Sequence, residues 1–296
     1  MHASFSLLRH QRPMLNVIAS IIFKAFAQNK NPVKEHRLSS ERFNILPNPE
    51  IVESYHKWLG CHDRYSQQIA PHLFPNWTYP QLFSLGKKLH LPLHKVLNQG
   101  CKMVINSPIR LNSALSSKAE IYQIKNMDQK IRLSQRLTTG TLEDSNALEA
   151  EIYAVILKNS KKILGRKKEL SEIDTSKLNL LKILDITKED AKSYAYLSGD
   201  VNPIHLSRNI ARLMGLKGSI MHGFGLFAMI FETLQNQGFD ISSIDVRFIS
   251  PVYLGSKVQI FLQESSKPRH HSLRVISEDN KHLHLAGDFS YRSARV

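Results

Sequence analysis

The 296-residue sequence predicts an α+β protein in which antiparallel strands surround a long buried helix. Hydrophobic residues make up 42% of the chain and aromatic residues 8%, which is typical of a packed core and excludes disorder. Residues 221–236 (MHGFGLFAMIFETLQN) are apolar almost all round, as in a helix that a sheet buries. Stretches of alternating or β-branched residues precede and follow this helix, and they predict strands. At roughly 100–200 residues per domain, the length favours two domains.

The first half is expected to hold an apolar helix, a connector and a strand meander. Residues 15–27 (LNVIASIIFKAFA) are interrupted by polar side chains and fall short of the ~20 residues of a membrane helix. We therefore expect an amphipathic helix that lies on the domain, or that touches a membrane peripherally through residues 14–27. No convincing signal-peptide cleavage pattern follows it. The polar segment 29–49 is expected to be a connector. Strands are expected at 107–124, 130–140 and 147–160.

A charged stretch without apolar periodicity, residues 161–176, marks the expected domain boundary. The chain is accordingly divided into an N-terminal helix and connector (1–48), a first domain (49–165) and a second domain (166–296). In the second domain, Thr187 with the acids that follow it fits the start of a helix that continues through Tyr196. Another helix is expected around 207–214. Strands are expected at 178–186, 244–248, 257–263, 272–277 and 282–292.

Charge and cysteine content narrow the function classes. Forty basic and 25 acidic residues leave a net charge of +15, which favours an acidic partner. The positive charge is dispersed, and the densest run, 158–168, lacks the aromatic residues of a single-strand-binding groove. We interpret that run as a solvated linker and expect no nucleic-acid partner. Cys61 and Cys101 are too few for a disulfide framework or a cysteine-rich zinc site, which fits a reducing, cytoplasmic location.

The segment YLSGDVNPIH, residues 196–205, concentrates the residue types that carry chemistry. Asp200 and His205 lie five positions apart, and Pro203 restricts the residue before it to extended conformations. Both side chains can therefore face one point, where a carboxylate and an imidazole can hold and deprotonate water. The alternative is structural, with an Asx turn at Asp200, an ordinary loop and a surface histidine.

This segment resembles the signature of the MaoC-like dehydratases and R-specific enoyl-CoA hydratases, which have the hot-dog fold. The signature runs aromatic, Ala, x, apolar, Ser, Gly, Asp, x, Asn, Pro, apolar, His, and every position is filled. The matching residues are Tyr194, Ala195, Leu197, Ser198, Gly199, Asp200, Asn202, Pro203, Ile204 and His205. A second landmark, the pair His222 and Gly223, begins the apolar helix, and residues 246–260 resemble the strand passage after it. The resemblance covers about residues 180–296.

The first half resembles the N-terminal half of double hot-dog members of this family. Thr78, Tyr79 and Pro80 match a landmark there, and residues 107–115 resemble the strand entry that follows. No second copy of the catalytic signature occurs before residue 180. The resemblance thus implies a double hot-dog fold, in which each half is a curved antiparallel sheet around a central helix. The first half would be degenerate and would form the substrate tunnel together with the second.

The resemblance also implies an activity, the reversible addition of water to a trans-2-enoyl thioester to give an R-3-hydroxyacyl thioester. Asp200 and His205 would activate the water, Asn202 would fix the geometry, and the Gly223 amide would bind the thioester oxygen. His222, Phe224 and Tyr196 are the expected substrate-binding residues. Two of these have structural alternatives, since His222 could simply support the helix start and Phe224 could belong to the core.

No metal or redox cofactor is implied by the resemblance, and the thioester would be carried by coenzyme A or by acyl carrier protein. Four further histidines, at positions 270, 271, 282 and 284, lack a closed ligand set and are expected to face solvent.

Two other functions remain open. One is a non-catalytic acyl-thioester binding or partner protein of fatty-acid metabolism, against which the intact Asp200, Asn202 and His205 argue. The other is a basic nucleic-acid-binding protein, which rests on net charge alone. A homodimer is possible, although a double hot dog can form the usual dimer contacts within one chain.

Overall fold

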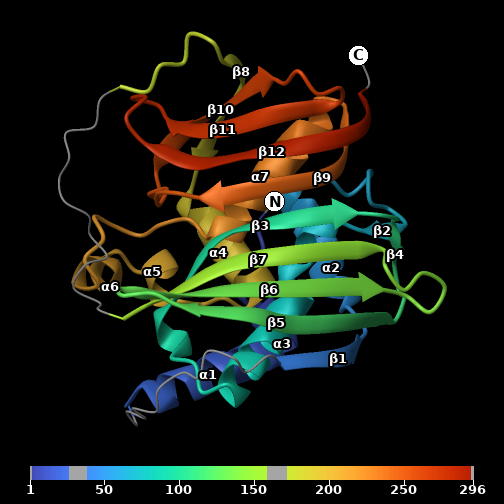
Figure 1. Cartoon of the computed structure of the whole chain (residues 1–296), viewed down its shortest axis with the longest axis vertical. Helices are drawn as coiled ribbons and strands as arrows, with labels where there is room; N and C mark the ends of the chain where they lie inside the picture. Colours follow the sequence, from blue (N-terminus) through green and yellow to red (C-terminus); the bar gives the residue numbers. More distant parts are fainter. Residues whose placement is uncertain (1, 27–38, 159–171, 295–296) are drawn as a thin grey trace.

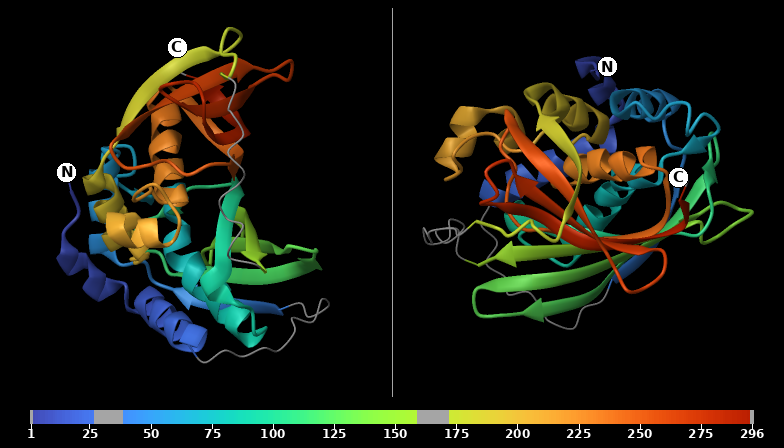
Figure 2. Two further views of the ribbon diagram at one scale, coloured as in Figure 1. Left: turned by 90° about the vertical axis from the view of Figure 1, so that its left-hand side faces the viewer. Right: turned by 90° about the horizontal axis from the view of Figure 1, so that it is seen from above.

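A computed structural model describes residues 2–26, 39–158 and 172–294, and in it both halves of the chain share one antiparallel sheet. The sheet has ten strands in the order β1-β5-β6-β7-β3-β9-β12-β11-β10-β8. Strands β3 and β9 pair at its centre, from Gly100 opposite Arg247 to Val104 opposite Ser243. Figure 2 shows the sheet curving around the helices on one side. This arrangement confirms the predicted α+β class.

The first half contributes five strands of the large sheet and three α-helices. Its strands are β1 (Ser39–Ile45), β3 (Val96–Ile105), β5 (Leu115–Asn126), β6 (Lys130–Gly140) and β7 (Leu148–Leu157). Its helices are α1 (Arg12–Phe26), α2 (Pro49–Leu59) and α3 (Pro75–Lys88). Short pieces complete it, namely the 3-10 turns η1 (Phe5–His10), η2 (Pro71–Leu73) and η3 (Leu93–Lys95) and the small pair β2 (Gln68–Ile69) and β4 (Ile109–Arg110).

The second half repeats this plan. Its strands are β8 (Asn179–Ile186), β9 (Phe239–Phe248), β10 (Ser256–Glu264), β11 (His270–Ser277) and β12 (Leu283–Ala294). Its helices are α4 (Lys188–Ser198), α5 (Pro203–Leu206), α6 (Arg208–Leu213) and α7 (Gly223–Asn236). In each half the first strand in sequence lies at an edge of the sheet, helices follow it (α2 and α3, or α4 to α7), the next long strand lies at the centre, and three strands fill the gap between them.

The repeat extends to helix lengths and caps. Helices α2 and α4 both have 11 residues, and both end at a left-handed glycine, Gly60 with φ 67° and Gly199 with φ 74°. Helices α3 and α7 both have 14 residues. Thr187 caps α4 and forms a capping box with Asp190, as its position before the acids predicts.

The core lies between the concave face of the sheet and helices α3 and α7. Phe227 and Phe231 of α7 are fully buried, and each contributes roughly 2–3 kcal/mol of hydrophobic free energy. Residues 221–236 are thus apolar almost all round because the helix is buried by the sheet, as predicted. Strand β6 shows the alternation that identified it, since Ile131, Leu133 and Leu137 point inward.

Two sequence expectations for the first half need correction. Within the expected connector 29–49, residues 39–45 form edge strand β1, which pairs with β5. Its polar composition (SSERFNI) suits an edge, where only one side of the strand is paired. The long central strand β3 was not expected, because its apolar residues are interrupted by Asn98, Gln99 and Gly100. The expected domain boundary at 165 and 166 lies outside the described residues.

Helix α1 lies against the first half, where it contacts α3 and η3. Met14 at its start is buried. Among the described residues, no helix is both long and apolar enough to cross a membrane. The expected peripheral membrane contact through residues 14–27 falls largely on side chains outside the described part of the chain and stays a prediction.

Candidate active site

The signature segment forms the turn between α4 and α5, and Asp200 is held in that turn by its backbone. Gly199 ends α4 in the left-handed conformation, which favours glycine. The Asp200 amide donates to Ser198 Oγ at 3.2 Å, and one Asp200 carboxylate oxygen accepts the Asn202 amide at 3.4 Å. Asp200 is half-buried, so its carboxylate is supported by the turn and still reachable from solvent.

His205 is oriented by a backbone carbonyl. It lies in α5, which begins at Pro203, and its Nδ1 is 2.9 Å from the Ile220 carbonyl oxygen. A carbonyl can only accept a hydrogen bond, so Nδ1 carries the proton and the neutral ring keeps its lone pair on Nε2. His205 therefore has a basic nitrogen available for chemistry.

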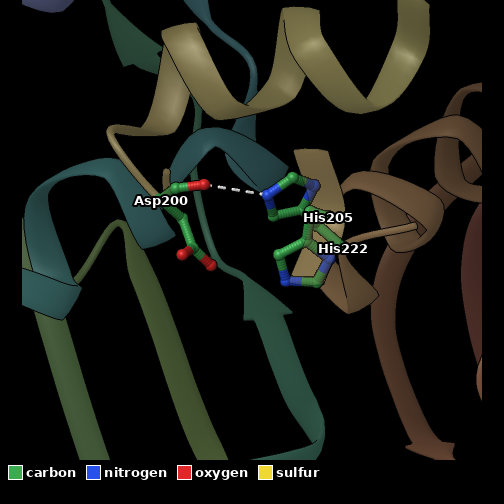
Figure 3. A group of neighbouring side chains, drawn as sticks. All are labelled: Asp200, His205 and His222. Carbon is green, nitrogen blue, oxygen red and sulfur yellow. Dashed lines mark hydrogen bonds between the residues drawn. The ribbon is translucent and has the colours of Figure 1, made fainter. Parts of the chain in front are cut away.

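His222 packs directly against His205. The two rings are stacked, with centroids 3.7 Å apart and an angle of 24° between their planes. His222 Nε2 donates to the Asp200 carbonyl at 2.9 Å, the dashed line in Figure 3. Burial, and then the neighbouring His205, lower the pKa of His222 well below its usual range. His222 is thus a neutral ring that ties the Asp200 backbone to the start of α7.

Asp200, His205 and His222 converge, as the motif predicts for the first two (Figure 3). Each offers one oxygen or nitrogen atom, and these atoms all lie within 4.8 Å of one another. Such a set can resemble a metal site, yet an imidazole lone pair lies in the plane of its ring. Two nearly parallel stacked rings cannot both aim their lone pairs at one ion. The geometry fits a carboxylate and an imidazole that share a water molecule better than it fits a metal.

Gly223 is the first residue of α7, and its place explains the glycine. His222, the N-cap, makes no side-chain capping bond, so the first amides of α7 keep their donors and the positive end of the helix dipole. A Cβ on Gly223 would lie 2.7 Å from the Phe248 ring. The sequence argument assigned the glycine to the approach of the acyl group, whereas the structure shows that a protein side chain already fills this direction.

The other three candidate residues, Asn202, Phe224 and Tyr196, lie in three different surroundings. Asn202 is exposed and caps α5 by accepting the Ile204 amide at 3.3 Å, which suits a positioning role. Phe224 is buried among the rings of Phe74, Tyr79, Phe227 and Phe248, so its surroundings are those of a core residue.

Tyr196 faces away from the histidine pair, because its ring packs on Phe5 of η1. Two positions earlier, Tyr194 is buried and its ring centroid lies 4.9 Å from that of His222. Residues two apart on a helix point in nearly opposite directions, which accounts for the misplacement.

Tyr79 of the first half was not among the site residues expected from the sequence. Its hydroxyl accepts a hydrogen bond from the Asn98 side-chain amide at 2.8 Å. Burial, the neighbouring Tyr194 and then the charge of Asp200 raise the pKa of Tyr79, and its ring packs against that of Phe224 in α7 with centroids 5.4 Å apart. The Thr78, Tyr79 and Pro80 landmark in the sequence could have drawn attention to Tyr79, and the structure shows where that side chain lies.

The N-terminal segment also supports the turn. Gln11 is buried, and its side-chain amide donates to the Leu197 carbonyl in the last turn of α4. Asn76 donates to the same carbonyl at 2.8 Å. A Cβ on Gly199 would lie 2.9 Å from that of Gln11, so the segment is in close contact with the turn. Residues far apart in sequence thus hold the end of α4 that carries Asp200.

The four additional histidines do not all face solvent as expected. His284 is buried and lies 3.1 Å from Ser250 Oγ, and burial lowers its pKa. His271 stacks on Tyr291 at 5.6 Å. Among the described residues, the cluster of possible metal ligands is the Asp200 set and does not include these four.

Comparison with known families bears directly on this geometry. The model of the MaoC-like domain family matches residues 172–284. The chain carries a MaoC-like domain. The match includes the turn after α4, the histidine pair and the start of α7, and it confirms the resemblance that the signature indicated.

Curated relatives match parts of this chain. It is 30% identical to 3-hydroxyacyl-thioester dehydratase X of Mycobacterium tuberculosis over 101 residues, which is 34% of this chain and 36% of that protein. It is 33% identical to the mitochondrial 3-hydroxyacyl-acyl-carrier-protein dehydratase of Arabidopsis thaliana over 89 residues, 27% of this chain and 53% of the relative. Peroxisomal multifunctional enzyme type 2 of Drosophila melanogaster is 33% identical over 81 residues, 26% of this chain and 14% of the enzyme. The matches therefore span only part of each relative.

Solved structures match far more of the chain. The crystal structure of HtdX from Mycobacterium tuberculosis superposes with a TM-score of 0.67 at 18% identity, over 86% of this chain and 98% of that one. A MaoC-like dehydratase from Phytophthora capsici gives 0.67 at 16% identity, over 89% and 98%. These similarities cover both halves, and they show that the chain has the double hot-dog fold.

Proposed function

We propose that the chain is a hydro-lyase that interconverts trans-2-enoyl thioesters and R-3-hydroxyacyl thioesters. The observation that carries the proposal is the convergence of Asp200 and His205 beside the start of α7. The MaoC-like match and the dehydratase names of the relatives support the same reaction class. The R configuration rests on the family resemblance.

In the hydration direction, one water molecule adds across the carbon–carbon double bond. The water would be held between the Asp200 carboxylate and His205 Nε2, whose lone pair is free because Nδ1 donates to Ile220. The water oxygen bonds to the β-carbon of the enoyl group as its proton passes to this pair. The same pair returns a proton to the α-carbon, so the enzyme ends each cycle unchanged.

Negative charge develops on the thioester oxygen as the β-carbon is attacked. The Gly223 amide at the first position of α7 would donate to that oxygen, and the dipole of a 14-residue helix would favour the charge there. Neutral His222 holds the Asp200 backbone against this helix start through its 2.9 Å bond. The acid–base pair and the oxyanion donor are therefore kept at a fixed separation.

By the family resemblance, the thioester would be carried by coenzyme A or acyl carrier protein, and the net charge of +15 suits either acidic group. Both cysteines are buried and free, which supports a reducing compartment such as the cytoplasm. A homodimer stays a prediction.

The test is the loss of enoyl-thioester absorbance when the purified chain meets trans-2-enoyl-CoA substrates of short, medium and long chain. Chiral analysis of the product is expected to give the R-3-hydroxyacyl thioester. An S product would contradict the stereochemical part of the proposal. A folded protein that binds acyl thioesters but hydrates neither CoA nor carrier-protein substrates would favour the non-catalytic alternative.

A further inference from the structure

The surface beside His205 combines exposed apolar side chains with unpaired cations. Four apolar side chains on or just after α5 and α6 are exposed, which we call the flap patch: Leu206 (37%), Ile210 (40%), Leu213 (87%) and Met214 (58%). Single exposed apolar residues are normal, but four within nine positions of one surface segment make it a candidate interaction site. In Figure 1, α5 and α6 project from the side of the molecule.

The cations of this segment have no acidic counterparts. Arg208, Arg212 and Lys217 are exposed, and none of them forms an ion pair with a described residue. Residues 201–231 contain no aspartate or glutamate at all. The segment of the flap patch therefore combines four exposed apolar side chains with three exposed cations.

The flap patch is joined to the candidate site by the backbone. Leu206 follows His205 directly, and the carbonyl of Ile204 accepts the Ile220 amide at 3.2 Å. Ile220 in turn accepts the hydrogen bond that orients His205. A partner seated on the patch would thus lie beside His205 and the turn that carries Asp200.

We propose that the flap patch is the docking surface for an acidic acyl carrier protein that presents the thioester on its prosthetic arm. The inference rests on the proposed function and selects one of its two carriers. The phosphates of coenzyme A would account for the cations but give no reason to expose Leu213 and Met214. A second copy of this chain would bring the same unpaired cations face to face across a two-fold axis, which is unfavourable.

The experiment compares one enoyl chain, the one that the wild type hydrates fastest, on coenzyme A and on a bacterial acyl carrier protein. Two single variants probe the patch, Leu213→Ser for its apolar part and Lys217→Glu for its charge. Each has a matched control far from it: Leu142→Ser at a side chain that is 98% exposed in the β6–β7 turn, and Lys267→Glu in the β10–β11 turn. Binding of the carrier protein without substrate is measured in parallel by fluorescence anisotropy.

Each patch variant is expected to lower kcat/KM for the carrier-protein substrate about tenfold, to leave the CoA substrate within about twofold, and to weaken carrier binding to match. The control variants are expected to behave as wild type. Equal losses on both substrates, or no loss on either, would overturn the proposal. So would a patch that binds anionic phospholipid vesicles but not the carrier protein. If the wild type hydrates neither substrate while the patch variants still lose carrier binding, the proposed reaction fails and the docking surface stands.

Discussion

The two halves share one framework, but the candidate site residues lie in the second half. Helices α2 and α4 end at equivalent left-handed glycines, yet the next residue is Cys61 in the first half and Asp200 in the second. The buried thiol of Cys61 has its pKa raised by burial and offers no carboxylate. The two halves therefore place a residue at the same point of the fold, and the chemistry available there depends on the type of that residue.

The start of the central helix differs in the same way. In α7 the cap is His222 and the first residue is Gly223, whereas in α3 they are Phe74 and Pro75. Proline has no backbone N–H, so the first half cannot offer the corresponding oxyanion donor. At these three positions the first half therefore lacks the carboxylate, the histidine cap and the backbone donor of the second half.

In the first half, the segment after α2 contacts helix α7 of the second half. His72 and Tyr65 contact one carboxylate oxygen of the buried Glu232 of α7, at 2.8 and 3.0 Å, and Arg64 pairs with the other. A buried carboxylate requires such partners, because its desolvation is costly. The first half therefore supports the site by clamping α7 and by contributing Tyr79 and Asn76.

The largest difference between the halves is expected from changing one histidine in each, in the segment that follows α4 or α2. His205→Gln is expected to reduce hydration about 10²- to 10⁴-fold, because it removes the basic Nε2. His62→Gln, in the exposed loop of the first half, is the matched control and should leave the rate unchanged. Steady-state absorbance assays measure both. Comparable losses in the two variants would mean that the halves do not differ in the way described.

Gly223→Ala is expected to lower kcat roughly 10- to 100-fold, because the Phe248 ring must move and the start of α7 with it. Adding Phe248→Ala should restore much of the rate, since the substituted helix start retains its backbone amide. Gly218→Ala serves as the control, because a Cβ there meets atoms no closer than 3.9 Å. If the double variant is as slow as the single one, contact with Phe248 is not the reason for the glycine, and the approach of the acyl group would explain it instead.

A smaller effect concerns pH and a buried histidine of α2. Burial lowers the pKa of His56 to about 4 in the folded chain. The unfolded chain takes up the proton as pH falls below about 6.5, so folded-state stability is lost between about pH 6.5 and 4. At pH 5.5 the loss from this residue is roughly 1–2 kcal/mol.

Urea unfolding at pH 7 and pH 5.5 measures this dependence. His56→Gln is expected to flatten it, while His222 and His284, whose pKa values are also lowered, maintain part of the slope. An unchanged slope in His56→Gln would show that His56 is not held neutral in the fold.

The smallest expected effect is that of Gln11→Ala. The variant removes one of two donors to the Leu197 carbonyl and should cost about 1 kcal/mol of stability and a few-fold in kcat. Asn76→Ala removes the other donor and should behave alike. Thermal unfolding and the hydration assay together measure the pair. A rate loss with full stability would mean that Gln11 acts on the catalytic turn alone.

The second half could be predicted well from sequence because its signals are local. The apolar composition of residues 221–236 predicts a buried helix, and the acidic residues after Thr187 predict that Thr187 caps a helix. The convergence of Asp200 and His205 follows from their spacing around Pro203. The first half was harder, since β1 is a polar edge and β3 contains Gly100, where the backbone bulges against Val246.

Contacts between distant segments could not be predicted. Nothing in the motif indicates that Tyr194, rather than Tyr196, faces His222, because that depends on how α4 is rotated against the core. The reason for Gly223 depends on Phe248, which is 25 positions later and on another strand. The support from Gln11 links residues 186 positions apart.

The most direct test of the account is to compare Asp200→Asn with Asp63→Asn in the same hydration assay. The two aspartates lie in corresponding loops after α4 and α2, and both substitutions remove one charge with almost no change in shape. We predict that Asp200→Asn reduces kcat by about 10³-fold or more with unchanged unfolding, and that Asp63→Asn matches the wild type. Near wild-type turnover in Asp200→Asn would contradict the claim that the second half alone carries the chemistry.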